Sequence, residues 1–114
     1  MKWILISIIS LFVSSAWADN FSFLRDSPIR YFTEQDAILY KAATERVLNN
    51  YSDGKKMRWS NPKTQAGGVL VPSHTARENG VVCRNVTASI TAESRSGQST
   101  FRYCKIKGVW KIVS

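Results

Sequence analysis

The last third of the chain reads VVCRNVTASITAESRSGQSTFRYCKIKGVWKIVS over residues 81–114 and predicts three consecutive antiparallel strands. Its first strand alternates polar residues with the apolar residues Val86, Ala88, Ile90 and Ala92, which is typical of a strand with one buried face. A turn is expected at Ser94 to Gly97, and a two-residue turn at Lys107-Gly108 leads into the closing strand. The sheet is therefore expected to be built around this unit.

The two cysteines, Cys83 and Cys104, lie on the first and second of these strands. Counted from the expected turn, they are about two positions out of register, an offset that one β-bulge or a longer turn would remove. Opposed Cβ atoms are about 4.5–5.5 Å apart and a disulfide needs about 3.5–4.5 Å, so we predict a structural disulfide. A redox or metal-binding pair is the alternative, but there is no C-x-x-C spacing and no histidine nearby.

The N-terminus has the features of a secretory signal peptide. A short positive start is followed by an apolar run to Val13 and by an A-x-A sequence, which predicts a leader over 1–18 cleaved between Ala18 and Asp19. A retained anchor is the alternative, but the apolar run is shorter than the roughly 20 residues of a membrane span. Export agrees with a disulfide, so we expect a periplasmic protein that could associate with the outer membrane.

The chain is strongly basic, with 16 Lys and Arg against 8 Asp and Glu and a formal net charge of +8. On an exported protein this charge favours anionic neighbours such as lipid head groups or cell-wall polymers. Alternatively, the basic residues simply cover solvent-facing strand positions. Nucleic acid is not an expected partner, because the compartment is wrong and no binding motif is recognised.

Between the leader and the strands, the sequence predicts an extended arm and one helix. Residues 19–32 are expected to be extended because Ser27-Pro28 interrupts any helix, and the arm's apolar residues Phe21, Phe23 and Leu24 pack on the domain or dock on a partner. Thr33 is a good N-cap, and helical spacing continues to a stop at Asn49-Asn50. The buried stripe is expected to consist of Ala37, Tyr40, Thr44, Val47, Leu48 and Tyr51, with Asp36 on the polar side.

Two more strands are expected before the C-terminal unit, over Lys55 to Trp59 and over Gly67 to Pro72. Ser73 to Gly80 is expected to be a polar loop that carries His74. The predicted fold is therefore α+β: one N-terminal amphipathic helix packed on an antiparallel sheet of about five strands, forming a single domain over 33–114.

No catalytic constellation stands out in the sequence. The best set would centre on His74 beside Ser73 and Thr75, and a surface histidine in a loop is the simpler interpretation. One histidine and two paired cysteines cannot supply a zinc site. We therefore expect no enzyme activity, no cofactor and no metal. Trp59 and Trp110 are either core residues or platforms for a ligand.

A set of spaced residues resembles the C-terminal domain of the 17-kilodalton surface antigens of Gram-negative bacteria. These residues are Trp59-Ser60-Asn61-Pro62, Gly68-Val69, Pro72, Gly80, Cys83-Arg84, Gly97, Tyr103-Cys104 and Gly108 to Val113. The resemblance covers about residues 51–114. It does not extend to the family's glycine-zipper and lipoprotein portions, because residues 19–51 contain no glycine and no lipid-acceptor cysteine. It implies an envelope location and a structural disulfide. It implies no enzymatic reaction, because no catalytic residues of the family can be carried over.

The sequence thus predicts a non-enzymatic structural or interaction protein of the cell envelope. One expected role is that of an accessory subunit of an outer-membrane or secretion-system assembly, with an envelope complex as its partner. The alternative is a free periplasmic binding protein, or an inhibitor, that recognises an anionic envelope ligand or a protein.

Overall fold

The structure is a computed structural model that describes residues 27–114. The predicted leader, its cleavage site at Ala18 and Asp19, and the first part of the predicted arm with its apolar residues lie outside the described residues. In the part of the chain that is described, no helix is both long and apolar enough to cross a membrane.

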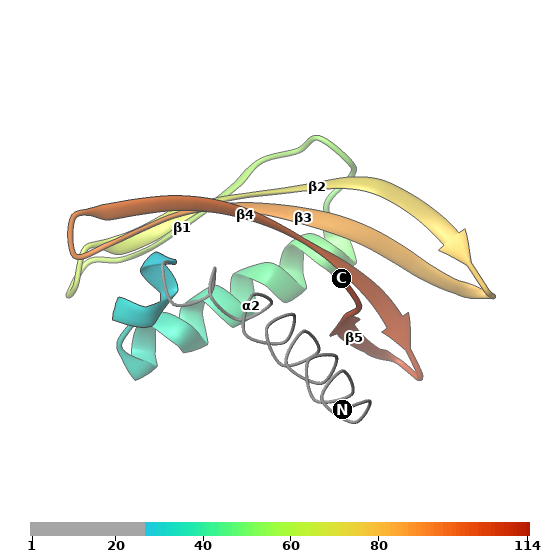
Figure 1. Cartoon of the computed structure of the whole chain (residues 1–114), viewed down its shortest axis with the longest axis horizontal. Coiled ribbons are helices and arrows are strands. Elements are labelled where there is room, and N and C mark those ends of the chain that lie inside the picture. The colour runs from blue at the N-terminus through green and yellow to red at the C-terminus, as the bar shows by residue number, and fades with distance from the viewer. Residues whose placement is uncertain (1–26) are drawn as a thin grey trace, which may run out of the picture.

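The described chain contains two helical segments followed by five strands. Their bounds are η1 Pro28–Tyr31, α2 Glu34–Asn50, β1 Met57–Asn61, β2 Ala66–Glu78, β3 Val81–Ala92, β4 Arg95–Ile106 and β5 Val109–Ile112. The strands form one antiparallel sheet in the order in which they occur in the sequence. The sheet curls over α2, which lies against one of its faces (Figure 1). This arrangement confirms the predicted α+β fold.

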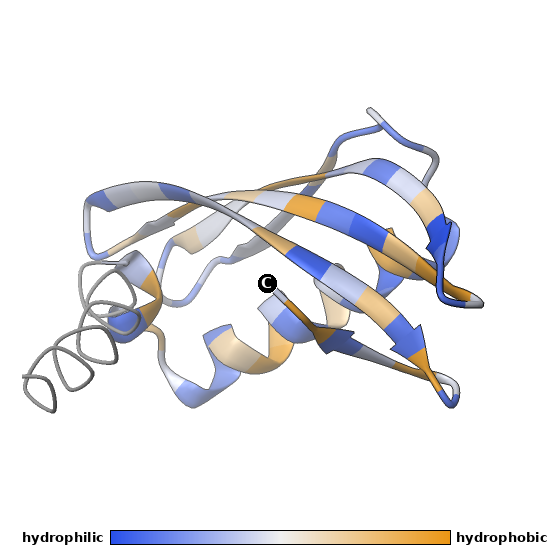
Figure 2. Ribbon diagram, turned by 45° about the vertical axis from the view of Figure 1, so that its right-hand side comes forward, coloured by the Kyte–Doolittle hydropathy of each residue, from blue (hydrophilic) through white to orange (hydrophobic). Residues whose placement is uncertain are grey.

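The core lies between α2 and the covered face of the sheet. The helix contributes Ala43, Val47 and Leu48, and the strands contribute Trp59, Ala66, Leu70, Val86, Ala88, Ile90, Ala92 and Tyr103. Polar and apolar residues alternate along the long strands (Figure 2). The predicted alternation of β3 is confirmed, since the four apolar residues of its buried face are at most 3% exposed.

The hairpin between β3 and β4 is tighter than predicted. Its turn consists of Glu93 and Ser94, which both have positive φ, rather than of residues 94–97. Positive φ at both central residues is typical of a two-residue hairpin turn whose twist matches the right-handed twist of the paired strands. The shorter turn removes the expected register offset, so Cys83 and Cys104 face each other directly without a bulge. They form the predicted disulfide, with Cα atoms 4.0 Å apart.

The end of the predicted arm is helical rather than extended. Pro28–Tyr31 forms the 3-10 helix η1, because proline is well placed at the start of a helix and the Ser27 hydroxyl caps it. The helix packs against the sheet at Gly97, where an added Cβ would lie 2.7 Å from Cδ of Pro28. Gly97 therefore belongs to a helix contact and not to a turn.

Strand β2 is longer than predicted and continues past Pro72 to Glu78, so Ser73 to Gly80 is not a loop. The carbonyl of Pro72 accepts a bond from the amide of Gly54, at 2.8 Å, and so points away from β3. In an antiparallel strand the N–H of a residue points the same way as its carbonyl, so the missing proton of proline costs no bond to β3. A register shift between Ser73 and Ala76 follows, and the strand then resumes.

Helix α2 begins and ends where the sequence predicts, with a capping box formed by Thr33 and Asp36. Asp36, however, was wrongly placed on the polar side, because it is only 1% exposed. Strand β1 starts at Met57 rather than Lys55, and its last residue, Asn61, meets Asp36. The Asn61 amide and the Thr64 hydroxyl both donate to Asp36 Oδ1 at 2.7 Å, while the Thr33 amide donates to Oδ2 at 2.9 Å. Burial raises the pKa of this carboxyl, but the hydrogen bonds outweigh burial and hold the pKa below its ordinary value.

Candidate functional site

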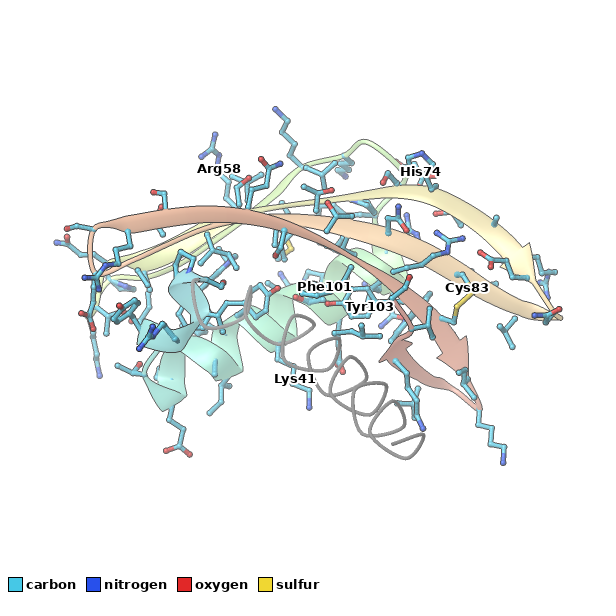
Figure 3. The ribbon with its side chains drawn as sticks, viewed as in Figure 1. Lys41, Arg58, His74, Cys83, Phe101 and Tyr103 are labelled. Carbon is cyan, nitrogen blue, oxygen red and sulfur yellow. A yellow bond between two sulfur atoms is a disulfide. The ribbon has the colours of Figure 1, made fainter. Side chains whose placement is uncertain are left out.

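An apolar groove runs between α2 and the strands β4 and β5. It has a volume of about 430 Å³, and its walls are formed by Tyr40, Lys41, Thr44, Glu45, Leu48, Tyr103, Trp110, Lys111 and Ile112. The groove exists because the sheet curls, which brings the short strand β5 down towards the C-terminal half of the helix (Figure 1). Tyr103 lies between the sheet and the helix (Figure 3).

Trp110 is the partly exposed tryptophan of the domain. Its indole N–H donates to Asn49 Oδ1 at 2.8 Å, which ties β5 to the end of α2. The ammonium of Lys105 lies 5.8 Å from the centre of its ring. On its other side a smaller hollow of about 270 Å³ reaches Arg84 and Thr75. Trp110 is therefore held in place by polar contacts while part of its ring remains available, as a recognition aromatic requires.

The two tyrosines of the groove remain neutral at physiological pH. Burial, and to a lesser extent the neighbouring Tyr40, raise the pKa of Tyr103 to about 12. Burial also raises the pKa of Tyr40. The tyrosine part of the wall is thus an uncharged surface suited to apolar groups.

Exposed aliphatic side chains lie on β5 and directly after it. Val109 and Ile112 are each 56% exposed and Val113 is 50% exposed. They share the C-terminal segment with Lys107 and Lys111. Apolar side chains grouped beside basic ones on a small domain are typical of an interaction site.

The end of α2 is held by one side chain, Arg84 of β3. Arg84 is only 7% exposed, and its guanidinium donates to the carbonyl oxygens of Val47, Leu48 and Tyr51 at 3.0, 2.8 and 2.5 Å. These carbonyls lie at the C-terminal end of α2, where a cation is favoured; the Val47 carbonyl also accepts from the amide of the C-cap residue Tyr51, at 3.1 Å. Arg84 therefore fixes the helix end that forms one wall of the groove.

Arg84 is also held by two side chains, Thr75 and Asp53. Its Nε donates to the Thr75 hydroxyl at 2.6 Å and its Nη2 contacts Asp53 Oδ1 at 3.0 Å. Asp53 accepts from both the hydroxyl and the amide of Thr75, at 2.6 and 3.1 Å. The hydrogen bonds from Thr75 lower the pKa of Asp53, and Arg84 lowers it further. They outweigh the effect of partial burial, which raises it, so the pKa is about 2.

We expect the domain to lose stability as the pH falls from about 4 to about 2. The unfolded chain protonates Asp53 near pH 4, whereas the folded chain keeps it ionised to about pH 2, so protons favour the unfolded state in this window. Asp36 contributes in the same direction. Urea unfolding of the wild type, Asp53→Asn and Asp36→Asn across this range measures the effect. Each variant should show a flatter pH profile, and profiles parallel to the wild type would contradict the assignment.

His74 does not assemble a catalytic set. It is exposed, has a φ of 52°, and its Nδ1 lies 3.1 Å from the Ser73 hydroxyl (Figure 3). Thr75, the third member of the considered set, is bound to Asp53 and Arg84 instead. Within residues 27–114, no three His, Cys, Asp or Glu side chains gather as metal ligands.

Trp59 is a core residue and not a ligand platform. It is 8% exposed, and its ring meets Phe32 and Tyr40 at centroid distances of 5.4 and 5.7 Å. Sequence reasoning left Trp59 and Trp110 undecided and missed the roles of Arg84 and Asp36. A signal for Asp36 was present, since it stands at the third helical position of a capping box. No local pattern indicates the role of Arg84, because the helix-end carbonyls that it binds lie 33 to 37 residues away.

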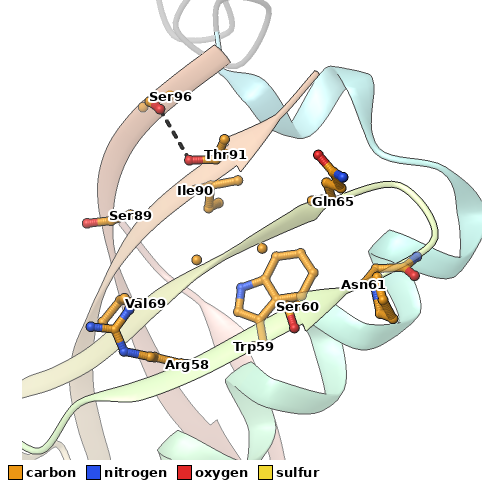
Figure 4. Close-up of a pocket in the computed structure, with 15 residues that line it drawn as sticks. Arg58, Trp59, Ser60, Asn61, Gln65, Val69, Ser89, Ile90, Thr91 and Ser96 are labelled. Carbon is orange, nitrogen blue, oxygen red and sulfur yellow. Dashed lines mark hydrogen bonds between the residues drawn. The ribbon is translucent and has the colours of Figure 1, made fainter. Parts of the chain in front are cut away.

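A shallow polar depression lies on the opposite face of the sheet, which α2 does not cover (Figure 4). Arg58, Ser60, Ser89, Thr91 and Ser96 surround it, and the last two share a hydrogen bond of 3.2 Å. Gly67 has no side chain to fill the depression. A Cβ at this position would lie 2.6 Å from the carbonyl oxygen of Trp59, so a larger residue would clash with β1. The depression is open and lined with small hydroxyl groups.

The fold is that of a small domain in which one helix packs on an antiparallel meander, with a partly exposed apolar groove between them. The chain is similar to proteins called 17 kDa surface antigen from Rickettsia prowazekii, Rickettsia felis and Rickettsia conorii, with 26% identity over 83 residues in each case. The match covers 71% of this chain and 52% of each relative, so it spans about half the length of these proteins. This similarity supports the resemblance seen in the sequence. No protein-family model and no solved structure matches the chain.

Proposed function

We propose that this chain is a non-enzymatic cell-envelope protein that acts by binding another protein through the apolar groove, as an accessory subunit of an outer-membrane or secretion-system assembly. The observation that carries the proposal is the groove itself, whose lining includes the exposed side chain of Ile112. Surfaces of this kind are stabilised when a partner covers them. The name of the similar proteins supports an envelope location, and the predicted leader supports export to the periplasm.

The geometry favours a contact with an apolar segment flanked by acidic groups. Leu48, Tyr103 and Trp110 form the apolar wall, while Lys41 and Lys111 border it. Glu45 is the one acidic residue in the lining. Basic residues at the rim would steer an acidic partner and the apolar floor would retain it.

A second candidate function is that of a free periplasmic protein that binds an anionic envelope ligand, such as a lipid head group or a cell-wall polymer. The observation in its favour is the cluster of Lys41, Lys105 and Lys111 around Trp110. An aromatic ring beside ammonium groups suits a ligand that has both an apolar and an anionic part.

Capture of the tagged chain from gently solubilised envelopes tests the first proposal. We expect recovery in a high-mass assembly at fixed stoichiometry, with a captured chain that starts at Asp19 and is two hydrogens lighter than its reduced form. Ile112→Glu should reduce recovery of the assembly at least tenfold, because it places a charge on the apolar surface.

Ile38→Glu is the matched control, because Ile38 is also 56% exposed but lies on α2 outside the groove. It should leave the assembly intact. Equal losses for the two variants would contradict a role for the groove. Recovery of the wild type as a free species near its own mass would overturn the subunit proposal and favour the second candidate.

A further inference from the structure

The polar depression on the uncovered face of the sheet is formed by two rows of side chains that cross the strands (Figure 4). Residues that pair directly across strands project to the same face of a sheet. One row consists of Arg58, Val69 and Ser89, and the next consists of Ser60, Gly67, Thr91 and Ser96. Ile90, which lies between the two rows on β3, is buried in the core, so both rows lie on the face opposite α2. The depression has a volume of about 650 Å³.

The middle of the polar depression is empty because β2 supplies only small residues there. Gly67 has no side chain, and Val69 is the neighbouring residue of β2 on this face. Arg58 and Ser60 stand on one side, on β1, and Ser89 stands on the other, on β3. Neighbouring strands are about 4.8 Å apart, so the backbones of β1 and β3 are about 10 Å apart. A molecule that lies along β2 would therefore meet polar side chains on both sides.

Four polar side chains at the border of the polar depression have no partner within residues 27–114. Those of Arg58, Ser60, Gln65 and Ser89 form no hydrogen bond and no ion pair in this part of the chain. The described residues that line the depression include no acidic one. All four side chains are exposed, so they bind water, which a ligand with suitable polar atoms can displace.

The chemistry of these side chains suits a ligand that carries hydroxyl groups and one anionic group. Arg58 presents a planar fork that fits a carboxylate or a phosphate. The hydroxyls of Ser60 and Ser89 and the amide of Gln65 can each donate and accept hydrogen bonds. The hydroxyl groups of a sugar have the same double capacity, so the two sets are complementary.

A peptide is a less suitable occupant, because the backbone of this region is already used. The N–H and carbonyl groups of β2 pair with β1 on one side and with β3 on the other over residues 67–70. Recognition of an extended peptide by a sheet uses main-chain bonds at a free edge. On the face of the sheet only side chains are left to form polar contacts, which favours a ligand whose own polar groups are hydroxyls.

We propose that the polar depression binds an acidic saccharide, whose carboxylate or phosphate group pairs with Arg58 while its hydroxyl groups bind Ser60, Gln65 and Ser89. Val69 offers an apolar contact to the C–H groups of the sugar. The formal net charge of the chain, +8, attracts such a ligand from a distance. The groove lies against α2 on the other face of the sheet, so this site is separate from the proposed contact with a protein.

NMR titration of the isotope-labelled chain with three sugars that differ only at one carbon tests the site. The probes are galacturonic acid, galactose 6-phosphate and galactose, which carry a carboxylate, a phosphate and a hydroxyl group there. We expect saturable shifts of the Gly67 and Ser89 amides with an acidic sugar, and at least tenfold weaker binding of galactose, because it lacks the charged hydrogen-bond partner of Arg58. The acid that binds more tightly identifies the anionic group. No saturable shift with either acid, or equal binding of galactose, would overturn the proposal.

Arg58→Gln should weaken binding of the preferred acidic sugar at least tenfold, because it removes the charge and the planar fork but keeps a polar side chain. Lys63→Gln is the matched control. Lys63 is exposed in the turn between β1 and β2 and does not line the polar depression, so its loss should change binding less than about twofold. Equal losses for the two variants would show attraction by net charge alone and would contradict a site at Arg58.

The polar depression and the groove can be tested separately. Ile112→Glu should bind the acidic sugar as the wild type does, because Ile112 lines the groove and not the depression. Arg58→Gln should leave capture of an envelope assembly through the groove unaffected. Shifts confined to Trp110 and Lys111 would place the sugar at the groove and overturn its assignment to the polar depression.

Discussion

Replacing Arg84 by methionine is expected to lower the free energy of unfolding by about 3–5 kcal/mol, the range seen when one partner of a buried charged network is removed. Arg84 makes five contacts with distances of 2.5–3.0 Å, three of them to carbonyl oxygens at the end of α2. Methionine fills much of the volume but donates no hydrogen bond. The Val47 carbonyl would keep its bond from the Tyr51 amide, but the Leu48 carbonyl would lose its donor, which carries the cost of desolvation.

Urea denaturation of the non-reduced protein measures this change, and Arg102→Met is the matched control. Arg102 lies on the neighbouring strand and pairs with Glu78, whose side chain is half exposed, so its loss should cost far less. Arg84→Lys should recover only part of the stability, because one ammonium cannot reproduce the planar fork of a guanidinium. Equal midpoints for Arg84→Met and Arg102→Met would contradict the role assigned to Arg84.

Loss of the disulfide between Cys83 and Cys104 has the second large expected effect. The bridge closes a loop with a sequence separation of 21, which the chain-entropy account values at roughly 3 kcal/mol. Both cysteines are buried and directly opposed, so the bridge also holds β3 and β4 in register. We expect the variant in which serine replaces both cysteines to be about 2–5 kcal/mol less stable than the oxidised wild type.

The reduced wild type serves as the control for the cysteine variants. With a reducing agent present, the wild type should approach the stability of the double serine variant, because the same constraint on the unfolded chain has been removed. The serine variant itself should not respond to the reducing agent. Equal denaturation midpoints for the serine variant and the oxidised wild type would show that the bridge contributes nothing to stability.

The neighbouring positions of Cys83 and Arg84 give the domain two anchors on opposite faces of one strand. Successive side chains of a strand point to opposite faces, so Cys83 bonds to β4 while Arg84 reaches the helix on the covered face. A shift of β3 by one residue would exchange the two faces and remove both anchors. The pair therefore specifies the register of the sheet and the position of the helix together.

The sequence alone determined those features whose causes are local. The capping box starts α2 at a fixed residue, the two-residue turn at Lys107-Gly108 sets the last hairpin, and alternation sets the buried face of β3. The same patterns were sufficient for the α+β fold and for the pairing of the cysteines. The cap, the turn and the alternation each depend on residues within a few positions of one another, where backbone geometry and the period of the element give one answer.

Only the tertiary structure decided the features that join distant segments. Asp36 is buried because Asn61 and Thr64 supply donors from 25 and 28 residues away, and four of the five acceptors of Arg84 lie 31 to 37 residues away. Strand β2 continues through Pro72 because β1 starts at Met57, opposite Leu70, and does not reach Pro72. The groove exists because the sheet curls towards α2. A polar group is tolerated inside a protein only when partners reach it, and a sequence pattern does not contain the three-dimensional path that brings them there.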